Sequence, residues 1–233
     1  MKEHIKQAIK IINPTLKNEG LTRLGQSRLW VEDNGYFAIV FELQPNSYCD
    51  AVFFNVSVCF LWEMSDGLNE AITFDYGNRL YVEGEDQIFY DENYDFYLSL
   101  YLANAIERIN KYRQFRDLKY ACDAYASKMR KNDFWDVYCY SILNFLYGKY
   151  DEGITYFRTF LEMLNNSIYE AGIYIEWRDR LYQCCKNERY PALANLENSR
   201  QYVIQMIRNR RKILSKRKGF DLFADELPLS EMI

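Results

Sequence analysis

Few residues in this chain have the types and spacing that enzyme catalysis needs. The one histidine, His4, lies in the first turn of a predicted helix, and we expect its side chain to be exposed there. Serine and cysteine hydrolases need a histidine base within a cleft, so the sequence disfavours both, although lysine bases remain an alternative. The glycine-rich GxGxxG and Walker sequences that bind nucleotide phosphates do not occur. We therefore assign no catalytic residue.

The densest group of carboxylates is the acidic stretch between residues 83 and 95. Its members are Glu83, Glu85, Asp86, Asp91, Glu92 and Asp95. Hard cations need converging carboxylates at loop spacing, and the Asp-x-Asp-x-Asn-Gly order of a calcium loop is missing. We favour a solvent-exposed connection, in which Asp91 and Glu92 lie at a helix N-terminus, where the helix dipole stabilises negative charge.

The six cysteines predict reduced, structural thiols. Four are isolated among apolar neighbours, namely Cys49, Cys59, Cys122 and Cys139, and the other two, Cys184 and Cys185, are adjacent. Zinc sites need a different spacing or histidine partners, so we expect neither a metal nor a cofactor. The first residues lack the apolar core of a signal peptide, and no stretch approaches the roughly 20 apolar residues of a membrane span. We therefore predict a cytoplasmic protein that does not bind membranes.

The strongest charge asymmetry is a basic run between residues 208 and 218. It contains seven cations and no acid, and its members are Arg208, Arg210, Arg211, Lys212, Lys216, Arg217 and Lys218. The net charge of the chain is −4, so removing the +7 of this run leaves −11. A basic run binds phosphate backbones or anionic lipids, or pairs with acids of the same chain. Because the body is acidic, we favour pairing within the chain or with an acidic partner over nucleic acid.

The tail 219–233 combines four acids with apolar residues and contains no base. Phe220, Leu222 and Phe223 are its candidate partner-binding residues. Such a segment docks either on its own body or in a groove of a partner. The sequence leaves both alternatives open.

The hydrophobic pattern predicts an α+β fold. An N-terminal helix carries Ile5, Ile9 and Ile12 on one face and is interrupted at Asn13-Pro14. An antiparallel β-meander follows, in which Asn34-Gly35 is a strong hairpin signal. Its strands are predicted at 28–33, 36–44, 51–62, 71–75 and 79–82, the last two around a turn at Tyr76-Gly77-Asn78.

From residue 91 the hydrophobic period changes to about 3.6 residues, which predicts an all-α C-terminal half of five or six helices. We predict these helices at 91–113, 118–131, 134–147, 150–164, 168–186 and 191–217. The predicted domains are an α+β domain over 1–90, a helical domain over 91–218 and the acidic tail over 219–233. No Gly/Ser linker separates the halves, so we expect them to pack together.

Several residues within 1–62 follow one recognisable pattern. They are Pro14, Leu16, Lys17, Gly20, Arg23, Gly25, Gln44 and the run Phe53-Phe54-Asn55. With them, the segment resembles a family of bacterial domains of unknown function that has a helix followed by a three-stranded meander. Leu21 replaces the aromatic residue of the family. The resemblance implies a bacterial α+β domain and no activity.

Residues 134–164 are similar to a tetratricopeptide-type helical hairpin. Gly148 would end the first helix, and Gly153 would allow the two helices to cross closely. Phe160 and Asn165 depart from the pattern, and there is no second copy, whereas a solenoid needs about three repeats. We therefore expect an ordinary helical hairpin.

The chain is rich in aromatic residues: 17% of its residues are Phe, Trp or Tyr, and 21 of these are tyrosines. Tyrosine packs in cores and is also enriched at protein interfaces. We predict a non-enzymatic protein-binding module, with an inhibitor-like or immunity-like role against a basic partner. The alternatives are a homodimer, a nucleic-acid-associated protein that uses the basic run, and an enzyme that uses carboxylates in a cleft between the halves.

Overall fold

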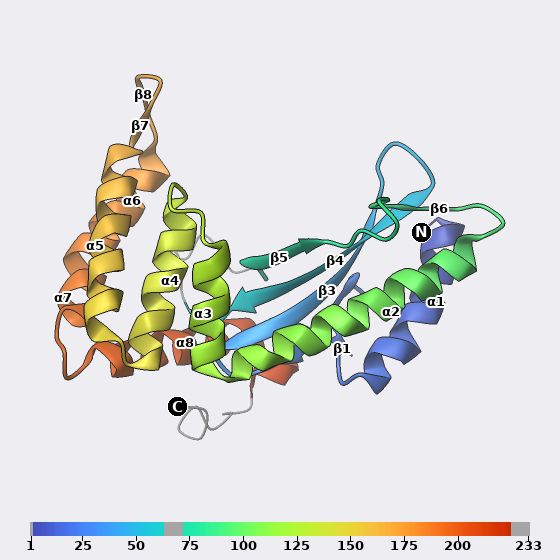
Figure 1. Ribbon diagram of the computed structural model, residues 1–233, viewed down its shortest axis with the longest axis horizontal. Helices are drawn as coiled ribbons and strands as arrows, with labels where there is room; N and C mark the ends of the chain where they lie inside the picture. The colour runs from blue at the N-terminus through green and yellow to red at the C-terminus, as the bar shows by residue number, and fades with distance from the viewer. Residues whose placement is uncertain (1, 63–71, 225–233) are drawn as a thin grey trace. The chain divides into compact units, whose positions relative to one another are not determined.

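The computed structural model describes residues 2–62 and 72–224 (Figure 1) and confirms the α+β fold class. An N-terminal helix and an antiparallel meander precede a mostly helical half. The helices are α1 Glu3–Asn18, α2 Tyr94–Arg113, α3 Leu118–Lys128, α4 Phe134–Tyr147, α5 Tyr150–Asn166, α6 Glu176–Cys184, α7 Tyr190–Leu193 and α8 Ser199–Ser215. The strands are β1 Thr22–Arg23, β2 Leu29–Asp33, β3 Phe37–Pro45, β4 Ala51–Phe60, β5 Tyr76–Arg79, β6 Ile88–Phe89, β7 Tyr169–Glu170 and β8 Ile173–Tyr174.

The described residues form two compact units. The first unit contains residues 2–61, 72–114 and 212–224, and the second contains Trp62 and residues 115–211. The predicted ranges 1–90 and 91–218 grouped α2 with the later helices. In the structure α2 belongs to the first unit, because its apolar face packs on β3 and β4 of the sheet.

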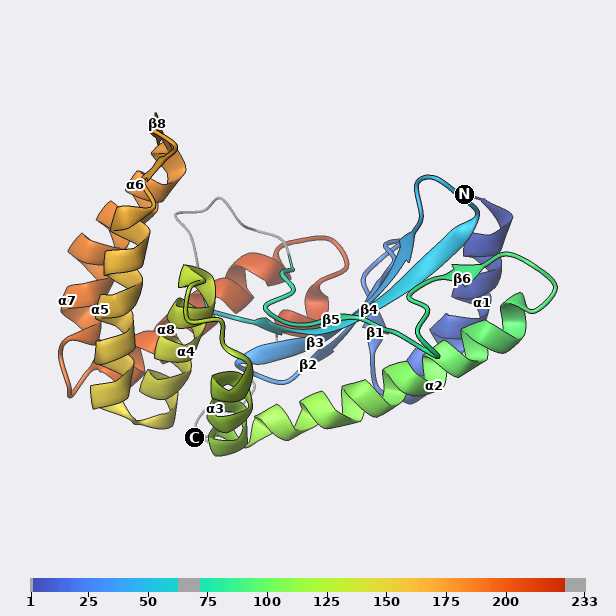
Figure 2. The same cartoon turned by 45° about the horizontal axis from the view of Figure 1, so that its top comes forward.

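The sheet of the first unit is antiparallel throughout, in the order β1-β2-β3-β4-β5, with β6 paired to one end of β4. Alternate residues of β3 and β4 share a face, as in the pairs Phe41↔Val56 and Leu43↔Phe54. On this face the ring of Tyr101 from α2 meets Phe54 edge-on, with ring centroids 6.0 Å apart. Figure 2 shows α2 running along the sheet, next to α1.

The predicted turn at Tyr76-Gly77-Asn78 is wrong, because these residues form β5. Gly77 has a φ of +127°, and a Cβ atom on it would lie 2.5 Å from the carbonyl oxygen of Val56. Glycine is therefore needed for the close approach of β5 to β4. Residue 71 of the strand predicted at 71–75 lies outside the described residues, and 72–75 is not a strand.

The sequence predicted that the first helix is interrupted at Asn13-Pro14, and this prediction is wrong. Helix α1 continues through Pro14 to Asn18. A proline within a helix removes one backbone hydrogen bond. Ile12 before it and Leu16 after it are both fully buried on the same face, and this burial offsets the loss.

The helical hairpin of α4 and α5 has the predicted form. Gly148 ends α4 in the left-handed conformation, with a φ of +88°. A Cβ atom on Gly153 would lie 2.9 Å from the ring of Phe145, so the expected close helix crossing is confirmed.

The helix predicted at 168–186 is wrong over its first part. Tyr169–Glu170 and Ile173–Tyr174 instead form a two-stranded hairpin, and α6 starts at Glu176. The reason is the turn Ala171-Gly172, in which both residues have a positive φ, of 51° and 80°.

The helix predicted at 191–217 is also interrupted. It breaks between α7 and α8, where the Asn195 side chain accepts a hydrogen bond from the backbone N–H of Glu197 at 3.1 Å.

Candidate functional site

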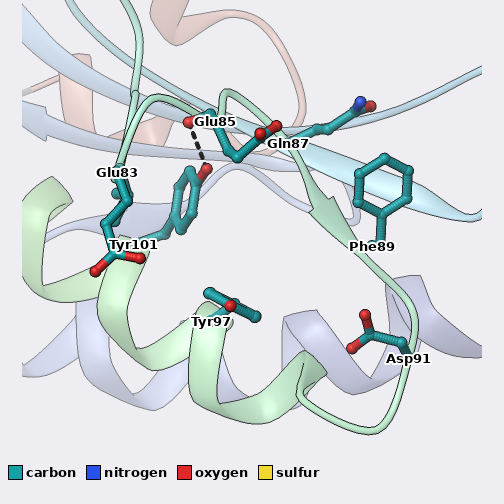
Figure 3. Close-up of a pocket in the computed structure, with 8 residues that line it drawn as sticks. Glu83, Glu85, Gln87, Phe89, Asp91, Tyr97 and Tyr101 are labelled. Atoms are coloured by element: carbon teal, nitrogen blue, oxygen red, sulfur yellow. Dashed lines mark hydrogen bonds between the residues drawn. The ribbon is translucent and has the colours of Figure 1, made fainter.

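A pocket of about 360 Å³ in the first unit is formed by part of the acidic stretch and by α2 (Figure 3). The lining residues are Val82, Glu83, Glu85, Gln87, Phe89, Asp91, Tyr97 and Tyr101. Three of these eight residues are carboxylates, three are aromatic and none is basic. We call this site the acidic pocket.

A tight turn over Val82–Glu85 forms one wall of the acidic pocket. The backbone N–H of Val82 donates to the carbonyl oxygen of Glu85 at 2.9 Å, and the N–H of Glu85 donates back to Val82 at 3.0 Å. The two central residues, Glu83 and Gly84, have φ values of 56° and 91°. A left-handed conformation costs a residue such as glutamate roughly 1 kcal/mol. Residues held in such conformations cluster at functional sites.

Tyr101 of α2 anchors this turn through a hydrogen bond. Its ring is buried, and its hydroxyl donates to the carbonyl oxygen of Glu85 at 2.6 Å. Burial first, and then the negative charges of Asp86, Glu85 and Glu83, raise the pKa of Tyr101 to about 12. The hydroxyl therefore keeps its proton at neutral pH and remains a hydrogen-bond donor. The same charges mark the acidic pocket as a region of negative potential.

Two aromatic rings of the acidic pocket remain in contact with solvent. Phe89 is 47% exposed and Tyr97 is 37% exposed. In Figure 3 the Tyr97 ring lies between the side chains of Glu83 and Asp91, and Phe89 lies on the side of Asp91. Exposed rings beside carboxylates form a surface that can bind an organic cation.

The ion pairing of the carboxylates in the acidic pocket differs from that of the neighbouring Asp86. Within residues 2–62 and 72–224, no lysine or arginine forms an ion pair with Glu83, Glu85 or Asp91, whereas the neighbouring Asp86 pairs with Arg79 at 2.9 Å. The three carboxylates lie apart around the pocket in Figure 3. Accordingly, the described part of the chain contains no group of three His, Cys, Asp or Glu side chains placed to hold a metal ion.

The sequence located part of this site. Asp91 and Glu92 lie just before Asn93, the N-cap residue of α2, so they are at the helix N-terminus as predicted, and both are exposed. The sequence did not predict the pocket itself. The dipeptide Glu83-Gly84 was the signal for the tight turn, because a residue followed by glycine suits a two-residue hairpin.

The seven cations of the basic run do not form one exposed surface. Arg210 and Arg211 are buried, with only 9% and 5% of their surface exposed. Four others are exposed and Arg217 is half-buried; the exposed four are Arg208, Lys212, Lys216 and Lys218. A phosphate backbone could reach only the solvent-facing members, and their role in binding a partner stays a prediction.

The described beginning of the tail packs on the first unit. A Cβ atom on Gly219 would lie 2.9 Å from the backbone nitrogen of Gly25, so the two backbones are in close contact. Phe223 is buried, and Phe220 and Leu222 are half-buried. Of the four acids in the tail, Asp225, Glu226 and Glu231 lie outside the described residues. A partner-binding role of the tail stays a prediction.

His4 is buried, and the expectation that it is exposed was wrong. Only 2% of its surface is exposed. Its backbone carbonyl accepts a hydrogen bond from Tyr94 of α2 at 2.9 Å, and its ring lies 5.6 Å from that of Tyr90. Burial lowers the pKa of His4, and the carboxylate of Asp50, 3.8 Å from Nδ1, opposes this effect in part. The contact with α2 explains the burial, and the sequence pattern of α1 alone could not reveal it.

The cysteines are free thiols within the described residues, and four of the six are buried. Burial raises the pKa of both Cys122 and Cys185 to about 12. A thiol that stays protonated at neutral pH is a poor nucleophile. These two cysteines are therefore packing residues.

Among the helices that the structure describes, none has both the length and the apolar character that crossing a bilayer requires. Comparisons of the chain with protein-family models, curated protein sequences and solved structures found no match. The resemblance of residues 1–62 to a bacterial domain family stays a prediction.

Proposed function

We propose that the chain is a protein-binding module that recognises a basic partner through the acidic pocket of its first unit. The observation that carries the proposal is a combination around one opening: two solvent-exposed rings, and three carboxylates with which no lysine or arginine of residues 2–62 and 72–224 forms an ion pair. Charged groups that serve only the fold are usually paired or dispersed over the surface. A concentrated, uncompensated set gains most when a partner supplies the opposite charge.

The charge distribution of the whole chain also supports binding to a basic partner. Outside the basic run the charge is −11, so an approaching basic protein is attracted from beyond the pocket. Exposed aromatic rings next to the carboxylates add contact area of the kind that is enriched in protein interfaces. The same negative potential repels a phosphate backbone, so the acidic pocket lends no support to nucleic-acid binding.

The finer proposal is an inhibitor-like or immunity-like role. A protein with a basic functional surface loses access to its own ligands when an acidic, aromatic surface covers it. Charge complementarity gives such a complex a fast association rate and a strong dependence on salt.

Selection from a random peptide library displayed on phage tests the proposal. Peptides are selected on the wild-type chain and then on the variant Glu83→Gln/Glu85→Gln/Asp91→Asn. The control variant is Glu152→Gln/Glu162→Gln/Glu197→Gln, which loses the same charge at exposed positions of the second unit.

We expect the selected peptides to be basic, to bind the control variant like the wild type and to bind the pocket variant at least tenfold more weakly. Their dissociation constants should rise at least tenfold between 50 mM and 500 mM NaCl, roughly the range over which ionic screening becomes strong. Peptides without excess positive charge, or equal binding to both variants, would overturn the proposal.

A further inference from the structure

We infer that the acidic pocket is a receptor for one arginine side chain of the partner, whose guanidinium stacks on Tyr97 and donates hydrogen bonds to the carboxylates beside it. This inference rests on the proposed function and specifies the group that is recognised. It follows from the spacing of the carboxylates, from the exposed rings and from a similar arrangement elsewhere in the same unit.

The spacing of the carboxylates favours a broad cation over a compact one. Glu83 and Asp91 lie on opposite sides of the Tyr97 ring in Figure 3 and do not converge on one point. The ammonium of lysine is a compact charge, which would reach one carboxylate and leave the other unpaired. A guanidinium is planar and carries five N–H donors that point outward in its plane. It can therefore serve two separated carboxylates while its face lies on a ring.

The first unit already contains a guanidinium bound in this manner. Arg79 lies over the ring of Phe53, 3.7 Å from its centroid, and donates to the carboxylate of Asp86 at 2.9 Å. It also donates to Oε1 of Gln44 at 3.2 Å. Asp86 belongs to the same acidic stretch as the pocket residues. The acidic pocket has the ring and the carboxylates of this arrangement, and the guanidinium is the component that a partner would supply.

The pocket is large enough to take a whole arginine side chain. Its volume of about 360 Å³ lies near the lower end of the roughly 300–1,000 Å³ that is typical of ligand pockets. A helix or a folded loop would need a longer groove. One arginine at the centre of an interface is a common binding hot spot, because it combines charge, stacking and several hydrogen bonds.

One wall of the pocket is fixed before a ligand arrives. The hydrogen bond from Tyr101 to Glu85 and the two backbone hydrogen bonds of the Val82–Glu85 turn hold the backbone of Glu83 in place. A preformed site avoids the entropic cost of ordering its own groups on binding.

Titration with two small probes tests the inference, followed by amide resonances in NMR spectra. The probes are Nα-acetyl-arginine methylamide and Nα-acetyl-lysine methylamide at low salt. We expect the arginine probe to shift the amides of residues 82–91 and 94–101 and to bind at least fivefold more tightly than the lysine probe.

Variants of one residue sharpen the test. Tyr97→Ala should lower the affinity for the arginine probe at least fivefold, whereas Tyr97→Phe should keep it, because the ring remains. Tyr169→Ala, which removes an exposed tyrosine of the second unit, is the matched control and should change nothing.

Equal affinity for both probes, or arginine-induced shifts outside the pocket, would overturn the arginine inference. Either result leaves the proposed function standing if the selected basic peptides still need the pocket carboxylates. The converse result, arginine binding at the pocket without any selection of basic peptides, supports the arginine site and overturns the protein-binding function.

Discussion

The carboxylates near the two ends of α2 differ in their ion pairing. At its C-terminal end Arg113 donates to both carboxylate oxygens of the nearly buried Glu32, with the shortest contact at 2.7 Å, and also pairs with Glu19. At its N-terminal end the carboxylates of the acidic pocket have no such partner in the described part of the chain. The comparison indicates that where an acid serves the fold, the chain supplies the cation itself. Where the cation is missing, we propose that a partner brings it.

The largest expected effect is a loss of stability when the ion pair between Arg113 and Glu32, at the C-terminal end of α2, is broken. Arg113→Ala leaves the carboxylate of Glu32 nearly buried and without its guanidinium, which should lower the free energy of unfolding by about 3 kcal/mol. Urea denaturation measures this loss. The comparison variant at the other end of α2, Glu85→Gln, should change the free energy of unfolding by less than about 0.5 kcal/mol. Similar losses in both variants would remove the distinction between the two ends.

The second expected effect is a pH dependence near the N-terminal end of α2, where His4 packs against Tyr90 and Tyr94. Because burial lowers the pKa of His4, the folded chain favours the neutral ring. The stability that this residue contributes is present above the unfolded-state pKa of about 6.5 and is lost as the pH falls through the lower folded-state pKa.

The variant His4→Gln isolates this effect from other titrating groups. The wild type should lose stability relative to the variant below about pH 6.5, with a slope of at most about 1.4 kcal/mol per pH unit for one proton. Lys2 and Asp50, the charged groups that face His4, are present in both proteins. A stability difference that stays constant between pH 5 and pH 8 would contradict the prediction.

A smaller effect is expected for the hydrogen bond that positions the pocket wall. Tyr101→Phe removes the donor to Glu85 and should cost about 1 kcal/mol of stability. Hydrogen exchange at the amides of Val82 and Glu85 should accelerate, because the turn loses its anchor on α2. Tyr97→Phe, in which the lost hydroxyl belongs to a partly exposed ring, serves as the control and should leave both measurements unchanged.

The smallest expected effect separates stability from binding. Asparagine tolerates the left-handed conformation better than glutamate, so Glu83→Asn should raise the free energy of unfolding by about 0.5 kcal/mol. The same variant should weaken the binding of basic peptides, because a carboxylate of the pocket is lost. Ala171→Asn makes the equivalent change in the hairpin of the second unit, where φ is 51°. It should stabilise to a similar extent without affecting binding; a parallel loss of binding in both variants would count against a local role of Glu83.

The sequence predicted those elements whose signal is local and periodic. The spacing of apolar residues predicted helices at 91–113 and 134–147 and a strand at 51–62. The structure has these elements at 94–113, 134–147 and 51–60. Glycine was harder to interpret, because Gly77 marks a close approach of two strands and Gly172 a turn, and the local sequence does not distinguish these uses.

The sequence predicted the acidic residues of the candidate site but not the pocket that they line. Its function as a pocket depends on Tyr97 and Tyr101, one and two helical turns into α2, meeting a tight turn at residues 82–85. Helical periodicity predicts that Tyr97 and Tyr101 share a face, but it does not predict which segment packs over that face. The burial of His4 and of Arg210 depends in the same way on elements that are distant in the sequence.

The contact of Gly219 with Gly25 has a consequence for how the chain folds during synthesis. The first unit takes its last segment from residues 212–224, so it stays incomplete until the whole of 115–211 has left the ribosome. At about 5–20 residues per second, this gap lasts on the order of 10 s. During that time the nascent sheet lacks the segment that later packs at Gly25. A chain shortened before residue 212 should therefore accumulate an incomplete first unit even if its second unit folds normally.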